Sequence, residues 1–244
     1  MRRAELVSVP LVPVRETFSV GSALSRSLSI WKRNLVFFLG VAFIAVLPTL
    51  PELPYGGSRW ALWWAALVLG LTVRNIAEGI VAYSVLEQLR GRTPPAVEAL
   101  ARGWSKAGAL FAATLFTSCL IAGAALAFIV PGIILAVRWV LLSQVVVAEG
   151  EVDPRARSAE ITAGHRWAIF GLMVLYVLAN VIASVALAAV IGRFLSAGPT
   201  KIIGNLVSST LTLSFSAVLY SVVYYQLRSE KEGIDIEQLT SVFQ

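Results

Sequence analysis

The sequence is poor in the residue types that most often carry catalysis or bind metals. It holds one cysteine and one histidine, and only 14% of its 244 residues are charged. A single cysteine, Cys119, excludes an intrachain disulfide and a cysteine zinc cluster. Sequence signatures of zinc proteases, serine hydrolases and phosphate-binding loops are also absent, as is an acidic cluster suited to a catalytic metal. We therefore expect no cofactor, no metal and no enzymatic activity.

The sequence is rich in apolar residues. Hydrophobic residues make up 57% of the chain, and its mean hydropathy is strongly positive. A soluble core of this size could not hide so much apolar surface from water, so much of it is expected to face lipid. The net charge of +6 falls mainly at the ends of apolar runs. This distribution predicts a membrane protein and argues against a nucleic-acid partner.

The apolar runs predict an all-α polytopic membrane protein with six transmembrane helices. At 1.5 Å per residue, a membrane-spanning helix needs about 20 apolar residues. We predict one transmembrane domain over residues 20–228, with a cytoplasmic arm over 1–19 and a cytoplasmic tail over 229–244. No cleavable signal is expected, so the first span would direct insertion. The predicted spans cover residues 35–50, 60–90, 107–130, 133–148, 167–191 and 201–227.

Three short helices are predicted at the membrane surface, one before each pair of spans. They cover residues 22–31, a stretch that begins near Thr93 and Pro94, and residues 155–163. Thr93 is expected to be an N-cap followed by Pro94, and Asp153 with Pro154 is expected to start the third short helix in the same way. A short helix followed by a hairpin of two spans would thus occur three times, which predicts a threefold pseudo-repeat.

The basic residues predict the orientation. Fifteen of the 20 lysines and arginines would lie on the side that holds both termini, against only Arg59, Arg193 and Lys201 on the other side. By the positive-inside rule, both termini and all three short helices are expected to be cytoplasmic. The expected location is the bacterial inner membrane.

Three segments carry a family resemblance: PGIILAVRWVLLSQVVVAEG, ARSAEITAGHRWAIFGL and YYQLRSEKEGIDI. The chain resembles the YciC-type family of bacterial six-span proteins, and also the membrane region fused to some glycerophosphodiester phosphodiesterases. The catalytic barrel of those phosphodiesterases is absent from this sequence, so no hydrolase activity is expected. The resemblance implies the six-span topology. Its most specific positions are Pro131, Gly132, Val137, Arg138, Glu149, Gly150, Arg157 and Ser158.

Arg74 and Glu78 are charged residues in the middle of a predicted span. Arg74 is about 21 Å from Trp60 and about 24 Å from Arg90 along the helix, near the bilayer midplane. Glu78 follows by four residues, a spacing at which two side chains on a helix can meet. The pair is either a structural ion pair or a polar site for a lipid headgroup or transported solute.

Arg138 lies within another apolar run, after a predicted structural break at Pro131 and Gly132. Glu78 is the only acidic residue deep in a predicted span, so the two arginines would share one carboxylate. The surplus positive charge would attract an anion, and a lipid phosphate is the nearest abundant one. Alternatively, Arg138 reaches the membrane surface or binds carbonyls exposed by the break. Arg74, Glu78 and Arg138 therefore form the candidate anion or lipid site.

Aromatic and basic residues at the ends of the runs predict contacts with anionic lipid headgroups. Polar residues within the last two spans, among them Asn180, Ser208 and Thr212, are expected to form interhelical hydrogen bonds. The predicted interfacial lipid contacts are Trp31, Lys32, Arg33, Trp104, Lys106, Arg166 and Trp167.

Two main functional hypotheses follow. The first is a non-enzymatic membrane protein that binds lipid or acts as a scaffold or accessory subunit, with membrane lipids and either a membrane-protein partner or a second copy as partners. The second is a transporter or lipid-translocating protein that uses the candidate anion site. A membrane enzyme of lipid metabolism is a third hypothesis, for which no residue stands out.

Overall fold

The protein is helical throughout its described part. The computed structural model describes residues 18–49, 60–150 and 153–232, and every regular element within these ranges is a helix. The predicted arm and tail lie largely outside them. The elements are α1 (Val20–Arg33), α2 (Leu35–Val46), η1 (Leu47–Thr49), α3 (Trp60–Leu89), α4 (Ala96–Ser105), α5 (Ala107–Ala127), α6 (Ile129–Arg138), α7 (Leu142–Glu149), α8 (Pro154–Ile161), α9 (Arg166–Ile191) and α10 (Ala197–Glu232).

The described part of the chain confirms the predicted all-helical class, and several of its helices are long and apolar enough to cross a membrane, as in a membrane protein. Five stretches qualify: Val68–Leu89, Ala107–Ala127, Ile129–Glu149, Arg166–Ile191 and Gly198–Glu232. A sixth candidate span is obtained only when α1 and α2, which meet at an angle of 88°, are counted as one span. The 12 residues of α2 extend only about 18 Å, so the predicted first span is short.

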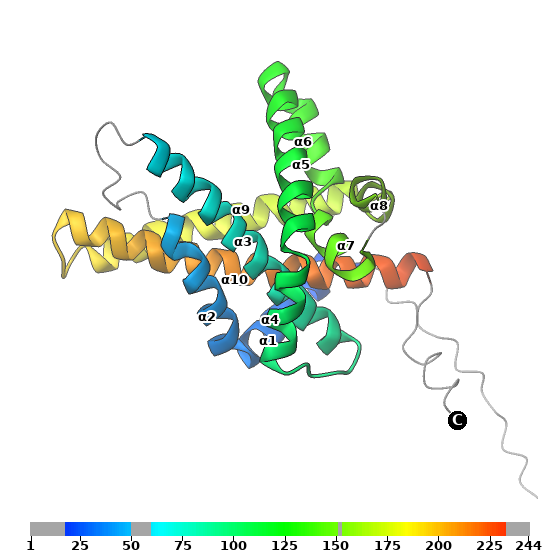
Figure 1. Ribbon diagram of the computed structural model, residues 1–244, viewed down its shortest axis with the longest axis horizontal. Coiled ribbons are helices and arrows are strands. Elements are labelled where there is room, and N and C mark those ends of the chain that lie inside the picture. Colours follow the sequence, from blue (N-terminus) through cyan, green and yellow to red (C-terminus); the bar gives the residue numbers. More distant parts are fainter. Residues whose placement is uncertain (1–17, 50–59, 151–152, 233–244) are drawn as a thin grey trace, which may run out of the picture.

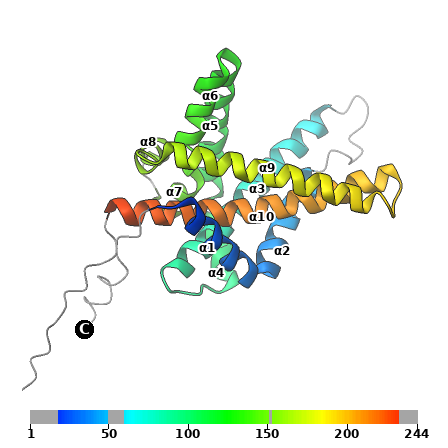
Figure 2. The same ribbon diagram turned by 180° about the vertical axis from the view of Figure 1, so that it is seen from behind.

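The helical hairpins diverge from a common centre. Both views show the α5/α6 hairpin pointing in one direction and the α9/α10 hairpin in another, with α2 and the start of α3 forming a third arm (Figures 1 and 2). The short helices α1, α4 and α8 gather around the centre. The order of a short helix followed by two clearly longer helices is seen only for α8, α9 and α10, since α2 has 12 residues against 14 for α1, and α6 has 10 residues like α4. The threefold pseudo-repeat stays a prediction.

The turn between α5 and α6 falls earlier than predicted. The chain breaks at Phe128, whose backbone is extended, and Pro131 lies in the first turn of α6. Proline is tolerated there because the first turn of a helix needs no intrahelical N–H donors. Gly132 permits the tight hairpin, since a Cβ at this position would lie 2.6 Å from the Ala125 Cβ. The predicted break at Pro131 and Gly132 was therefore displaced by three residues.

The predicted fourth span is interrupted. Residues 139–141 form a turn between α6 and α7, where a continuous helix over 133–148 was expected. The carbonyl of Arg138 accepts hydrogen bonds from Ser158 Oγ at 2.9 Å and Thr162 Oγ1 at 3.3 Å. In a continuous helix, this carbonyl would accept a hydrogen bond from a backbone N–H. At the break, the two hydroxyl groups from α8 and its C-terminal end take the place of that donor.

Of the two predicted helix N-caps, one is observed as predicted and the other is displaced. Asp153 caps α8 by accepting from the Arg155 and Ala156 N–H groups, and Pro154 is the first helical residue, as predicted. In contrast, α4 begins at Ala96 with Pro95 as its N-cap, so the prediction of Thr93 and Pro94 was wrong by two residues. The second of two consecutive prolines keeps the first out of helical backbone angles.

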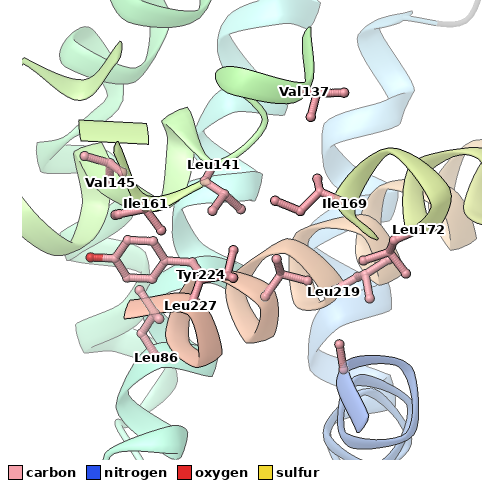
Figure 3. Close-up of a cluster of buried hydrophobic side chains, with 12 residues drawn as sticks. Leu86, Val137, Leu141, Val145, Ile161, Ile169, Leu172, Leu219, Tyr224 and Leu227 are labelled. Atoms are coloured by element: carbon pink, nitrogen blue, oxygen red, sulfur yellow. The ribbon is translucent and has the colours of Figure 1, made fainter. Parts of the chain in front are cut away.

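The buried core lies where the helices converge. Figure 3 shows Leu86 of α3, Val145 of α7 and Ile161 of α8 around the ring of Tyr224 of α10, and Ile169 of α9 farther along the same cluster near Leu219. The core thus joins helices that are far apart in sequence. Outward from it, apolar side chains become exposed, most clearly along α9 and at the tip of the α5/α6 hairpin.

Candidate functional site

Arg74 and Glu78 meet on α3, as their spacing predicts. Arg74 Nε donates to Glu78 Oε1 at 3.4 Å, and Ser143 Oγ of α7 donates to Glu78 Oε2 at 3.5 Å. The side chain of Glu78 is 23% exposed and that of Arg74 is 48% exposed. The carboxylate is therefore held between two helices, while the guanidinium reaches outward, and among the described residues it is bonded only through its Nε.

Arg138 does not join this pair. Within the described part of the chain, its side chain forms no ion pair, and its buried Nε has no hydrogen-bond partner. Its backbone carbonyl is engaged by α8, as described above. The structure thus brings Arg74 and Glu78 together and leaves Arg138 at the separate junction between α6, α7 and α8. A shared anion site of all three residues stays a prediction.

A second charged cluster, not foreseen from the sequence, lies where α7, α8 and α10 meet. At its centre, Glu149 accepts from Tyr224 Oη at 2.6 Å and from Arg157 Nε at 2.8 Å. Arg228 Nη1 lies 3.6 Å from the same carboxylate. The side chains of Glu149 and Arg157 are only 10% and 18% exposed. These residues and Glu232 are called the Glu149 cluster below.

The Glu149 cluster is closed by further contacts. Arg157 Nη2 also contacts Glu232, and Arg228 donates from Nε to Glu232 Oε2 at 2.7 Å and from Nη1 to Tyr224 Oη at 3.0 Å. Burial acts to lower the pKa of Arg157, but hydrogen bonds and charges from Glu149 and Glu160 outweigh it and raise that pKa. Charges in the cluster are therefore satisfied by one another.

The sequence contained a partial signal for this cluster. Glu149 and Arg157 are among the positions given for the predicted family resemblance, and Tyr224 and Arg228 lie in a segment quoted for that prediction. Glu149 and Tyr224 are 75 residues apart in the sequence, so their contact could not be predicted from a local pattern. Only the folded chain brings the ends of α7 and α10 together.

Polar side chains connect α9 and α10, as predicted. Thr212 Oγ1 donates to Asn180 Oδ1 at 2.6 Å, and the Ser184 and Ser208 hydroxyls are 2.6 Å apart. Tyr176 Oη donates to the Thr212 carbonyl at 2.7 Å. In an apolar environment such bonds hold two helices in register. This pattern confirms the interhelical hydrogen bonds predicted for Asn180, Ser208 and Thr212.

The predicted interfacial residues differ in their surroundings. Trp104 and Trp167 are strongly exposed. Trp31 is partly buried, and its Nε1 donates to Ser214 Oγ of α10 at 3.1 Å. Lys32 and Arg33 are exposed in the last turn of α1, where Arg33 Nη2 donates to Gln88 Oε1 at 3.2 Å.

The remaining predicted contacts lie at helix junctions. Lys106 separates α4 from α5, and Arg166 begins α9, with its Nη2 3.4 Å from the Ala159 carbonyl. Their predicted binding to lipid headgroups stays a prediction.

The described residues contain no group of three or more histidine, cysteine, aspartate or glutamate side chains placed to hold a metal ion. A scan against protein-family models, a search of curated proteins and a search of solved structures find no match to this chain. The resemblance to the YciC-type family therefore stays a prediction.

Proposed function

We propose that this chain is an integral protein of the bacterial cytoplasmic membrane that binds anionic lipid and acts as a scaffold or accessory subunit, without catalysis of its own. One observation carries the proposal. An apolar 18-residue stretch of α9 has none of its residues buried, and one of α5 has only 11% buried. Such faces require lipid or another membrane protein as their environment.

The placement of two short helices, α4 and α8, supports a single lipid-binding side. Tyr83 Oη of α3 donates to Glu98 Oε1 of α4 at 2.6 Å, and Gln226 of α10 contacts Ser22 of α1. Arg157 of α8 contacts Glu232 of α10. Helix α4 thus packs near the C-terminal end of α3 and α8 packs at the C-terminal end of α10, while α1 runs along α10 from Gln226 to Ser214. We place this side and both termini in the cytosol, following the positive-inside rule.

The charged residues also favour a scaffold. Glu149 and its neighbours join three helices and are engaged with one another. Glu78 is engaged by Arg74 and Ser143. Carboxylates committed to structural contacts are poorly placed to act as a general base or nucleophile. This makes lipid binding and assembly the preferred interpretation.

The test is extraction of the full-length protein with a patch of its native membrane, followed by quantification of phospholipids and identification of bound proteins. Each basic residue near an anionic surface favours binding by about 1 kcal/mol, roughly fivefold. We expect anionic phospholipid to be enriched severalfold over the bulk membrane, together with a reproducible protein partner or a second copy. A lipid composition equal to the bulk membrane and no bound protein would contradict the proposal.

Transport remains the second candidate because the Arg74 side chain is half-exposed and meets a single carboxylate. An anion could use its remaining donors. Arg138→Ala and Glu78→Ala separate the two functions. A scaffold should keep its bound lipid and its fold in both variants. Loss of solute flux in reconstituted vesicles from both variants, with lipid binding unchanged, would instead favour the transporter.

A further inference from the structure

The two long helical hairpins differ in the chemistry of their turns. The turn between α9 and α10 carries Arg193 and lies close in sequence to Lys201, and cations of this kind suit a headgroup layer. The α5/α6 hairpin has no charged residue between Lys106 and Arg138. Its turn instead presents large apolar side chains that are 65 to 89% exposed, namely Leu126, Phe128, Ile129 and Val130.

A charged helix, α8, packs against both legs of the α5/α6 hairpin. The Arg155 guanidinium lies 4.7 Å from the centre of the Phe116 ring on α5. On the other leg, the carbonyl of Arg138 at the end of α6 accepts from Ser158 Oγ at 2.9 Å. Arg155 also lies 3.7 Å from Asp153, and both of these side chains are more than one third exposed. Such a charged helix belongs at the membrane surface rather than in hydrocarbon.

The hairpin beyond its contacts with α8 is about as long as one leaflet is thick. Phe116 precedes the turn at Phe128 by 12 residues, or about 18 Å of helix, and the 10 residues of α6 extend about 15 Å. One leaflet of the hydrocarbon core is about 15 Å thick, and the whole core is about 30 Å thick. With α8 at the surface, both legs therefore place the turn near the middle of the bilayer.

The exposed surface of α5 changes at the same level. Its exposed large apolar side chains begin at Leu115, whereas the exposed residues before that point, Gly108, Ala109 and Ala112, are small. Figures 1 and 2 also show this hairpin pointing in a different direction from α9 and α10, so the two hairpins cannot both follow the membrane normal. A tilted α5/α6 hairpin reaches a smaller depth than its length allows.

The turn between α5 and α6 is short, which limits the polar backbone that it brings into hydrocarbon. Its single extended residue, Phe128, donates its N–H to the Ala124 carbonyl at 2.9 Å. Pro131, in the first turn of α6, has no N–H that would need an acceptor. A turn surrounded by lipid requires this economy, because hydrocarbon offers no partner to unpaired backbone groups.

We propose that the α5/α6 hairpin enters only the cytoplasmic leaflet, where its turn lies among the ends of the acyl chains, while α9 and α10 cross the whole bilayer. The inference rests on the membrane location and orientation given under the proposed function. The partner of this exposed apolar surface is the acyl chains of one leaflet. Both legs return to the cytoplasmic side, so the positions of the two termini are the same as for a full crossing.

The experiment introduces single cysteines into the full-length protein with Cys119→Ala as background. Ile129→Cys reports on the α5/α6 turn, and Ser196→Cys, in the turn before α10, is the matched control, since both side chains are exposed. Spheroplasts are treated with a charged maleimide that does not cross the membrane. We expect Ile129→Cys to react about tenfold more slowly than Ser196→Cys or not at all, because hydrocarbon excludes a charged reagent. Inverted vesicles should leave Ile129→Cys equally unreactive, and SDS should expose it.

A second measurement gives the depth of the turn. Each variant is labelled with a fluorophore in detergent and reconstituted in phosphatidylglycerol vesicles that carry a nitroxide either at the end of the acyl chain or at the headgroup. We expect the chain-end nitroxide to quench the fluorophore of Ile129→Cys more strongly than the headgroup nitroxide does. Ser196→Cys should show the reverse order. Val130→Cys, at another strongly exposed position, replaces Ile129→Cys if that variant does not fold.

Three results would overturn the proposal. Labelling of Ile129→Cys from the periplasm as fast as Ser196→Cys, or stronger quenching by the headgroup nitroxide, would place the turn at a membrane surface. Protection of Ile129→Cys without quenching by either lipid would mean that protein rather than lipid covers the turn. If Ser196→Cys is itself unreactive from the periplasm, the orientation under the proposed function fails, and this inference fails with it.

Discussion

The Glu149 cluster and the Arg74–Glu78 pair place charge in a largely apolar protein in opposite ways. Glu149 is nearly buried and has Tyr224, Arg157 and Arg228 around its carboxylate. Arg74 has one carboxylate at 3.4 Å, and about half of its side chain is exposed. The cluster joins three helices through mutually satisfied charges, whereas the pair sits on one helix and reaches a second only through Ser143.

This difference separates a structural role from a binding role. A buried carboxylate whose partners are all protein groups contributes to the fold, and removal of one member leaves the others uncompensated. An arginine with unused donors at the surface of a spanning helix adds little to the fold but can bind an anion. The following substitutions test the comparison through the free energy of unfolding in detergent micelles.

The largest effect is expected for Glu149→Ala. It leaves Arg157 and Arg228 without their central carboxylate and Tyr224 Oη without its acceptor. We expect a loss of about 3 kcal/mol, the range for breaking a buried ion pair. Glu149→Gln is the control, because it keeps an acceptor for Tyr224 and should lose less. A loss below about 1 kcal/mol from Glu149→Ala would show that the cluster does not hold the helices together.

A smaller effect is expected for Glu78→Ala. The Arg74 guanidinium is already half-exposed and can turn toward the membrane surface. Polar contacts between membrane helices contribute about 1 kcal/mol or less, so the loss should be of that size. Arg74→Ala, measured alongside, should be no more costly. If either variant were as unstable as Glu149→Ala, the pair would be a structural element like the cluster.

The smallest effect is expected for Glu160→Ala. Glu160 pairs with Arg157 at 3.0 Å but is 66% exposed. Exposed ion pairs contribute little, and Arg157 retains Glu149 and Glu232, so the change should stay within about 0.5 kcal/mol. A larger loss would mean that the outer contacts of Arg157, rather than its contact with Glu149, stabilise the junction.

Helix positions could largely be predicted from the sequence. The ends of α3 and α9 lie within one residue of their predicted limits, since hydrophobic runs and flanking polar residues define them. Asp153 and Pro154 predicted the start of α8 because capping is a local interaction. Arg74 and Glu78 met for the same reason, as residues four apart on one helix.

Features that depend on distant residues could not be predicted. The break after Arg138 is supported by Ser158 and Thr162, and the Glu149 cluster requires the end of α10 to lie beside α7. The contact of Gly132 with Ala125 fixed the hairpin turn at Phe128 rather than at the proline itself. Each of these depends on packing, which the local pattern does not encode.

Cys119 gives the most direct test of the central claim that the exposed apolar helices are covered by membrane. It is the only cysteine of the chain, and it is exposed on α5. In intact membranes, lipid should cover this thiol and keep it away from a water-soluble reagent. We predict that a water-soluble maleimide leaves Cys119 unlabelled until the protein is unfolded in SDS. Rapid labelling in intact membranes would contradict the account, because α5 would then lie in water.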